Sequence, residues 1–217
     1  MAAIVLKEHP GSVIVTDSVT STGLKWWIED HLGGVHHRFK RGYRNVINEA
    51  IRLNNEGKES YLALETSGHG ALKENYFLDD GAYQIAKILI KMAQLKATGD
   101  ETIDGLIAEL PEPVEAAEFR PKIVVDDFSA YADTVLEGFA RFAEQTEGWS
   151  LTPANYEGVH VTCDAESGDG WVLLRKSLHD PQLPINIESE QTGGVALIAA
   201  KVKTFLSEYK GLELPAM

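Results

Sequence analysis

Residues 60–70 of the chain read Ser-Tyr-Leu-Ala-Leu-Glu-Thr-Ser-Gly-His-Gly, a short apolar run followed at once by polar residues and glycine. The apolar part, over 61–65, is typical of a buried β-strand because it is short and bounded by turn-forming residues. The polar part is then expected to be a loop at the carboxyl end of that strand. In an open α/β sheet this is the edge where ligands usually bind. The stretch therefore indicates both a fold class and a first candidate site.

Strands alternate with helices on both sides of this stretch. We expect strands over 13–17 and 34–37, a helix capped by Thr22, and another helix from about residue 44 to Gly57. After the polar loop, Asp79 or Asp80 is expected to cap a further helix. The residues of that helix expected to face the core are Ile85, Ile88, Leu89, Met92 and Leu95. This alternation predicts a three-layer α/β sandwich with a mixed sheet over residues 1–110.

An acidic stretch with two prolines, Pro111 and Pro113, follows this first domain. We expect a short helix over 102–110 and an extended linker over 111–119, because proline interrupts helices. The second domain is expected over 120–217. Its predicted elements are a strand at 122–125, a helix capped by Ser129, strands at 159–162, 171–174 and 185–188, and a final helix after Gly193. Strands grouped between two helices predict an α+β fold, an antiparallel sheet with two helices on one face.

The charge of the chain is unevenly distributed. The 217 residues have a formal net charge of −13 and are 44% hydrophobic. Residues 1–95 carry 11 basic and 11 acidic side chains, whereas residues 96–217 carry 9 and 22. This asymmetry supports a division into two domains. The acidic balance argues against a general nucleic-acid or anionic-membrane binder, which needs a cationic surface.

Cysteine content and hydropathy indicate a cytoplasmic protein. Cys163 is the single cysteine, so no internal disulfide and no thiolate cluster for a metal can form. The longest apolar run, over 195–200, is far too short to span a bilayer. The first residues carry no basic leader of a secretory signal. We therefore expect a cytoplasmic location and no membrane partner.

The first candidate site is the polar loop after the strand at 61–65. Glu65, Ser67 and His69 place a carboxylate, a hydroxyl and an imidazole in alternation, and Gly68 permits a tight turn. These groups suit the vicinal hydroxyls of a sugar. A polar turn with a solvated Glu65 is the alternative interpretation, and the spacing alone favours neither.

The second candidate is Arg175-Lys-Ser-Leu-His-Asp-Pro181, which also follows an apolar strand. A guanidinium and a hydroxyl with free backbone N–H groups can bind a phosphate. The alternative is a solvated β-turn, since Asp-Pro often begins one. A third segment, His36 to Arg44, carries four arginine or lysine side chains and is either a cationic loop facing an anionic ligand or a solvated loop. Its adjacent His36 and His37 point to opposite sides of a strand and make a poor metal pair.

Together these three segments resemble the α-D-phosphohexomutase family, which includes the phosphoglucomutases and phosphomannomutases. The family's sugar loop G-E-x-S-G-H resembles Leu64 to His69, with leucine in place of the first glycine. Its phosphate loop R-x-S-[GN]-T-E-P resembles Arg175 to Pro181, and its R-T-x-V-G-x-K stretch resembles Arg38 to Val46. The order and spacing match the third and fourth domains of the family, that is, the C-terminal half of such an enzyme.

The resemblance implies a role for each loop. Glu65 and Ser67 would hold the ring hydroxyls of the sugar, and His69 would line the same site. The residues implied to bind the phosphate are Arg175, Ser177, His179, Arg38 and Arg44. His179 stands where the family has a small hydroxyl donor, which implies weaker or pH-dependent phosphate binding.

Two family motifs do not occur in the sequence. One is T-x-S-H-N, which carries the phosphoserine, and the other is D-G-D-x-D-R, which binds magnesium. The resemblance implies that both belong to preceding domains of a parent enzyme. That enzyme would be a magnesium-dependent phosphoprotein that interconverts hexose 1-phosphates and 6-phosphates through a bisphosphate.

This chain would then carry no catalytic or metal-binding residue of its own. Its expected partners are hexose phosphates and the N-terminal mutase domains, and alone it is expected to be inactive. The alternative is a free-standing, non-catalytic module that binds sugar phosphates. Glucose and mannose phosphates are equally compatible with the Glu-x-Ser pair.

Overall fold

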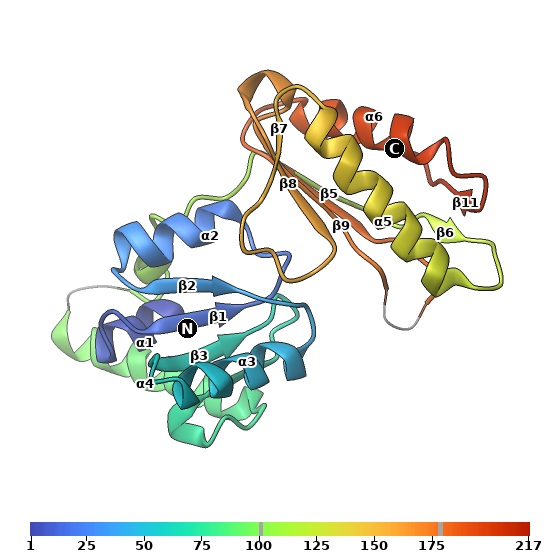
Figure 1. Ribbon diagram of the computed structural model, residues 1–217. Helices are drawn as coiled ribbons and strands as arrows, with labels where there is room; N and C mark the ends of the chain where they lie inside the picture. The colour runs from blue at the N-terminus through green and yellow to red at the C-terminus, as the bar shows by residue number, and fades with distance from the viewer. Residues whose placement is uncertain (100–101, 178–179) are drawn as a thin grey trace. The chain divides into compact units, whose positions relative to one another are not determined.

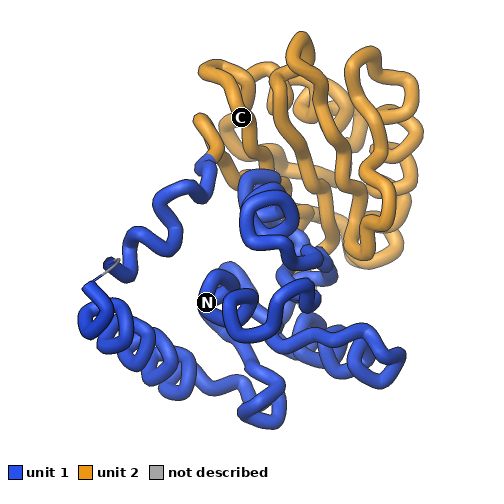
Figure 2. The backbone as a smooth tube through the Cα atoms, turned by 90° about the vertical axis from the view of Figure 1, so that its left-hand side faces the viewer, with its two compact units in different colours: residues 1–112 blue, residues 113–217 orange. Residues whose placement is uncertain are grey.

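The computed structural model describes residues 1–99, 102–177 and 180–217. The chain divides into two compact units, unit 1 over Met1–Glu112 and unit 2 over Pro113–Met217 (Figure 2). Each unit has its own hydrophobic core.

Unit 1 is built on a four-stranded sheet with the order β2-β1-β3-β4 (Figure 1). Its strands are β1 (Val13–Thr16), β2 (Val35–Arg38), β3 (Ser60–Leu64) and β4 (Gly70–Leu72). β1 is parallel to β2 and β3, and β4 is antiparallel to β3. The predicted mixed sheet is therefore confirmed, and β3 ends at Leu64, so Glu65 is the first residue of the loop.

Successive residues of the central strands contact helices on opposite faces of the sheet. Ile14 and Leu62 pack in a cluster with helix α1 (Ala2–Glu8). Val15 and Ala63, their next neighbours, pack in a separate cluster against α3. This alternation is what a strand covered on both faces requires. The predicted sandwich of helices around a sheet is therefore confirmed.

The helices of unit 1 begin close to where the sequence predicts. Ser21 rather than Thr22 caps α2 (Thr22–Trp26), because its hydroxyl accepts the N–H of Leu24. A π-helical segment, Trp27–His31, continues α2. α3 spans Tyr43–Asn55, and α4 spans Gly81–Thr98 with Asp80 as its N-cap.

The predicted inward face of α4 is wrong in part. Leu95 is buried and Ile88 is half-buried, but Ile85, Leu89 and Met92 are 60%, 57% and 43% exposed. The periodicity of the sequence specifies one apolar face, but the structure turns that face outward and buries Gln84 on the opposite, more polar side, where its amide donates to the carbonyl of Gly70.

The region expected to hold a helix and a linker is built differently. Within 102–110 the structure has only a 3₁₀ turn, Gly105–Ile107. The expected linker over 111–119 is also wrong in its second half. Glu115–Phe119 is strand β5, which pairs antiparallel with β10 of unit 2.

Unit 2 is a five-stranded antiparallel sheet with the order β5-β10-β9-β8-β7. Its other strands are β7 (Trp149–Leu151), β8 (Val159–Cys163), β9 (Gly170–Leu174) and β10 (Ile185–Ser189). The expected strand at 122–125 is shorter: Lys122–Ile123 is β6, which pairs with β11 (Leu212–Glu213) outside the main sheet.

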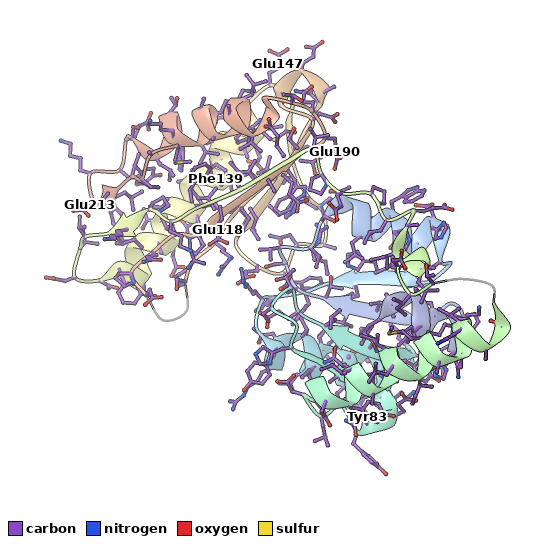
Figure 3. The ribbon with its side chains drawn as sticks, turned by 180° about the vertical axis from the view of Figure 1, so that it is seen from behind. Tyr83, Glu118, Phe139, Glu147, Glu190 and Glu213 are labelled. Carbon is purple, nitrogen blue, oxygen red and sulfur yellow. The ribbon has the colours of Figure 1, made fainter. Side chains whose placement is uncertain are left out.

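Two helices cover one face of this sheet, as predicted (Figure 1). They are α5 (Phe128–Gln145), capped by Asp127 rather than Ser129, and α6 (Gly194–Leu206). Phe139 of α5 is fully buried in their common core (Figure 3). The carboxylate of Glu115 on β5 accepts the N–H groups of Gly193 and Val195, which caps α6 from the sheet.

Candidate functional site

The loop between β3 and β4 carries the predicted sugar-binding residues at the carboxyl end of the parallel strands. Its two ends are joined by a hydrogen bond from the N–H of Glu65 to the carbonyl of His69, 2.8 Å long. The N–H of Gly68 donates to the carbonyl of Glu65, and Gly68 has a φ of +91°. That left-handed conformation is the reason for a glycine at this position. The loop is therefore a closed turn of defined shape.

Glu65 is buried, at 8% exposure, and its two carboxylate oxygens are both engaged. Oε1 accepts the backbone N–H of Gly42 at 3.2 Å and lies 3.7 Å from Nε of Arg41. Oε2 accepts the hydroxyl of Ser67 at 2.8 Å. The interpretation of Glu65 as a solvated turn residue is therefore wrong. The pair presents a fixed anionic acceptor beside a hydroxyl that can rotate.

Asp17 directly follows β1 and fixes the β3–β4 loop through hydrogen bonds. Its side chain is fully buried. Its Oδ2 accepts both the N–H of Thr66 at 3.0 Å and the Thr66 hydroxyl at 2.7 Å, and its Oδ1 accepts the N–H of Val19. Because β1 and β3 are parallel neighbours, a carboxylate just after β1 reaches the loop just after β3. Sequence reasoning did not assign Asp17 a role in the site. The signal was its place directly after a buried strand.

His69 lies in a cluster with Asp79 and Tyr43. Its Nδ1 donates to Oδ2 of Asp79 at 2.8 Å, and Oδ1 of the same carboxylate accepts the N–H of Gly70. The Tyr43 ring stacks on the imidazole with centroids 5.1 Å apart. With Nδ1 held by a carboxylate, the half-exposed ring has its Nε2 available for a ligand. Asp79 is thus a partner of His69, while Asp80 is the helix cap.

The basic segment after β2 is only partly directed at this loop. The Arg41 guanidinium lies beside Glu65, as described above. Arg44 donates to the Tyr43 hydroxyl at 3.2 Å and so belongs to the cluster around His69. Arg38 donates instead to the carbonyl of Ser21. Arg44 and Arg38, both expected at the phosphate, thus have different partners within unit 1, and Arg41 is the basic residue that the sequence did not single out.

The two adjacent histidines point to opposite sides, as expected. Nε2 of His37 contacts the buried carboxylate of Glu49 at 2.8 Å. Nε2 of His36 lies 2.6 Å from the hydroxyl of Thr16 on β1. Burial, with the nearby charges of Arg38 and Lys25, lowers the pKa of His36 from 6.5 to about 3. His36 is therefore neutral at physiological pH.

This low pKa predicts a loss of stability in acid. In the unfolded chain His36 binds a proton near pH 6.5, whereas in the folded chain it does so only near pH 3. The stability that neutral His36 contributes to the folded state is fully present above pH 6.5 and is lost as the pH falls toward 3. From pH 7 to pH 5 we expect unit 1 to lose about 1–2 kcal/mol through this group. His36→Gln, which does not titrate, is expected to remove that part of the pH dependence in urea unfolding; an unchanged pH dependence would contradict it.

The second candidate loop follows β9 in unit 2. The side chain of Arg175 is buried, at 8% exposure. Its backbone N–H donates to the carbonyl of Pro184. Ser177 is fixed by a backbone bond to Gln182, and its hydroxyl accepts the N–H of Asp180 at 3.3 Å. The ammonium of Lys176 pairs instead with Asp133 of α5 at 2.7 Å. His179 lies outside the described residues.

The described residues contain neither a metal-ligand cluster nor a membrane-spanning helix. Among the described residues, no three or more His, Cys, Asp or Glu side chains are grouped so that they could hold a metal ion. Within the same part of the chain, no helix has the length and apolar character that crossing a bilayer requires.

Cys163 is buried, which raises the pKa of its thiol to about 12 and leaves it unreactive.

Comparison with known proteins gives one family match. A family model described as phosphoglucomutase/phosphomannomutase, alpha/beta/alpha domain III, matches residues 1–112. No curated protein matches the chain.

Solved structures match nearly the whole chain. A phosphoglucomutase/phosphomannomutase family protein from Burkholderia thailandensis is 26% identical, with a TM-score of 0.73 over 99% of this chain and 42% of its own. A putative phosphomannomutase from Thermus thermophilus shares the fold at 15% identity, with a TM-score of 0.54 over 95% of this chain and 39% of its own. An N-acetylphosphoglucosamine mutase from Aspergillus fumigatus, solved with GlcNAc-6P and magnesium, shares it at 12%, with a TM-score of 0.56 over 94% and 45%. The chain thus spans less than half the length of each of these structures.

Proposed function

Because the chain belongs to the phosphoglucomutase/phosphomannomutase family, we propose that it is the part of a hexose-phosphate mutase that binds the sugar phosphate. The parent enzyme would interconvert a hexose 1-phosphate and a hexose 6-phosphate through a bisphosphate in the cytoplasm. Its magnesium and its phosphoserine would belong to other domains, since neither motif occurs in these residues.

The observation that carries this proposal is the pair formed by Glu65 and Ser67. A buried carboxylate held by a backbone N–H and a neighbouring hydroxyl has its position fixed before a ligand arrives. Each carboxylate oxygen keeps a second lone pair, so it can accept a sugar hydroxyl without losing its internal bond. Two adjacent acceptors in fixed geometry suit two vicinal hydroxyls of a pyranose ring.

His69 would act at the same site as an orienting group. Its imidazole is held at Nδ1 by Asp79 and against one face by Tyr43. Its Nε2 would accept a hydrogen bond from a sugar hydroxyl or, when protonated, donate one to a phosphate oxygen. Arg44, through its bond to Tyr43, would add positive charge beside it.

In unit 2, Arg175 and Ser177 would bind the phosphate that is not being transferred, together with His179. The guanidinium would supply paired N–H donors that match phosphate oxygens, and the bonds of Ser177 to Gln182 and Asp180 hold its hydroxyl in place. Phosphoryl transfer depends mainly on positioning and on stabilising charge, and these residues supply the positioning.

Binding without turnover is the expected behaviour of this chain. In calorimetry it should bind glucose 6-phosphate, while glucose, which lacks the phosphate, should bind much more weakly. In a coupled assay from glucose 1-phosphate with glucose 1,6-bisphosphate added, the rate should equal the enzyme-free background, because no phosphoryl donor is present. A full-length phosphoglucomutase serves as the positive control. Turnover by the chain, or the absence of binding of both glucose 6-phosphate and mannose 6-phosphate, would contradict the proposal.

A further inference from the structure

Asn186 lies on the face of the unit 2 sheet that is opposite its two helices. Ile185 and Ile187, its neighbours on β10, are both buried in the core beneath the helices. Successive residues of a strand point to opposite faces, so Asn186 is on the other face. Leu174 of β9 is in the same core, and by the same alternation Arg175 shares the face of Asn186.

The register of the strands places Arg175 diagonally beside Asn186. Asn186 stands opposite Leu173 of β9, and Arg175 is two residues further along that strand direction. The ladder extends this far, because the backbone N–H of Arg175 donates to the carbonyl of Pro184. Diagonal neighbours on one face of antiparallel strands are about 7–8 Å apart, a distance that long side chains span. The two side chains are therefore within reach of each other.

Glu118 fixes the orientation of the Asn186 amide. It stands opposite Asn186 on β5, the strand on the other side of β10, and its Oε2 accepts a hydrogen bond from Nδ2 at 3.1 Å (Figure 3). A carboxylate only accepts hydrogen bonds, so the NH₂ group of the amide must face Glu118. Arg120 donates to the other oxygen of Glu118 and holds this carboxylate in place. The oxygen of the planar amide is thereby turned away from Glu118.

This amide oxygen, Oδ1 of Asn186, is buried without a partner. Within the part of the chain that the structure describes it accepts no hydrogen bond. Water does not supply the missing bond, because the atom is closed to solvent. A buried acceptor with no donor lowers the stability of the folded chain, and such atoms are rare in native proteins. The oxygen is therefore expected to gain a donor in another state of the protein.

Arg175 is the neighbour on β9 that can supply this donor. Leu173 has no polar side-chain group, and the indole N–H of Trp171 already donates to Glu188 at 2.9 Å. The guanidinium of Arg175 carries five N–H donors, and a bidentate bond to a phosphate uses two of them. A guanidinium that binds a phosphate can therefore also donate to a protein acceptor beside it.

We propose that Asn186 positions Arg175 for binding the phosphate group of a hexose phosphate. In the phosphate-bound chain the Asn186 oxygen accepts one guanidinium N–H, which leaves two parallel N–H groups directed at the phosphate. Glu118 supports this arrangement, because it holds the amide in the orientation that presents its oxygen. The inference rests on the proposed function in that it takes Arg175 to bind the phosphate. Asn186 is then a positioning residue that acts through Arg175 and does not touch the ligand.

A double-mutant cycle between Asn186 and Arg175 tests this proposal. The variants are Asn186→Leu, Arg175→Ala and the two combined, since leucine is close to asparagine in size but has no amide. Calorimetry measures the affinity for glucose 6-phosphate, or for mannose 6-phosphate if the chain prefers it. We expect Asn186→Leu to weaken binding about tenfold in the otherwise unchanged chain, because a charge-assisted bond is lost. In the Arg175→Ala chain the same substitution should weaken binding less than about twofold.

Two further measurements distinguish positioning from a structural role. Asn186→Leu removes an unmet acceptor together with a single bond to Glu118, so the midpoint of urea unfolding should change little. The loss of affinity should be similar for inorganic phosphate, measured by NMR titration, because Asn186 acts on the phosphate group alone. Thr162→Val is the control, since it removes a hydroxyl from an exposed position on the same face of β8, and it should leave both affinities unchanged.

Four results would overturn the proposal. They are an unchanged affinity in Asn186→Leu, an equal loss with and without Arg175, a loss as large in Thr162→Val, and a stability loss that accounts for the loss of binding. A loss seen with the hexose phosphate but not with inorganic phosphate would also contradict it, since Asn186 would then contact the sugar. If Arg175→Ala weakens binding and Asn186→Leu does not, this inference fails while the proposed function stands. A chain that binds neither hexose phosphate would contradict both.

Discussion

Replacing Asp17 by alanine is expected to lower the free energy of unfolding of unit 1 by about 3 kcal/mol and to abolish sugar-phosphate binding. The substitution leaves two backbone N–H groups, those of Thr66 and Val19, and one hydroxyl without their buried acceptor. A donor left unmet costs about 1–3 kcal/mol where it is buried, and less at partly exposed positions such as Thr66, where water replaces part of the lost bond. The loop that carries Glu65 would then lose its support from β1.

Native-state hydrogen exchange at the amides of β3 measures this loss within unit 1. Thr66→Val is a graded companion, because it removes only the hydroxyl bond and is expected to cost about 1 kcal/mol. Asp30→Ala, at an exposed position, is the control for loss of a carboxylate and should change stability by less than about 0.5 kcal/mol. A cost for Asp17→Ala as small as that of Asp30→Ala, with binding retained, would contradict a supporting role.

Replacing Arg175 by alanine is expected to weaken glucose 6-phosphate binding by about 10- to 100-fold. A charge-assisted bond to an arginine contributes about 1.5–3 kcal/mol, which corresponds to that range of affinity. The backbone hydrogen bonds of β9 remain in this variant, and urea unfolding measures how far loss of the buried side chain lowers the stability of unit 2. Calorimetry with glucose 6-phosphate measures the change.

Lys176→Ala is the matched control for this experiment. It removes the same charge one residue away, but the Lys176 ammonium is engaged with Asp133 of α5. Its loss is therefore expected to change the affinity less than about threefold, consistent with the small contribution of an exposed ion pair. Equal effects of the two substitutions would indicate a general charge effect and would contradict a specific role for Arg175.

The elements found from the sequence are those whose signal is local. β1, β3, β9 and β10 are short apolar or alternating runs, and the structure contains each of them within a residue or two of the prediction. β5 was missed because Glu-Ala-Ala-Glu-Phe has little β propensity and follows two prolines. It is a strand because β10 offers a pairing edge, a non-local fact that overrides propensity.

The residues of the candidate site also fall into two groups, those that lie close together in the sequence and those that only the fold brings together. Glu65, Ser67 and His69 lie within five residues, so a motif could identify them. Asp17 and Thr66 are 49 residues apart in the sequence and meet only because β1 and β3 are parallel neighbours. The exposed side of α4 differs from the prediction for another reason. Periodicity places the face of Ile85, Leu89 and Met92 against the sheet, but contacts of Gln84 and Lys87 with residues distant in the sequence hold the opposite side there.

The separate cores of units 1 and 2 have a consequence for how the chain tolerates change. Among the described residues, the core clusters of unit 1 and the cluster of unit 2 share no member, so the packing lost by a core substitution is confined to its own unit. The costs in unfolding free energy of a substitution at Phe139 and of another at Leu62 are therefore expected to be additive. A core substitution beneath the loop after β3 therefore leaves the packing beneath the loop after β9 unchanged, and the reverse also holds.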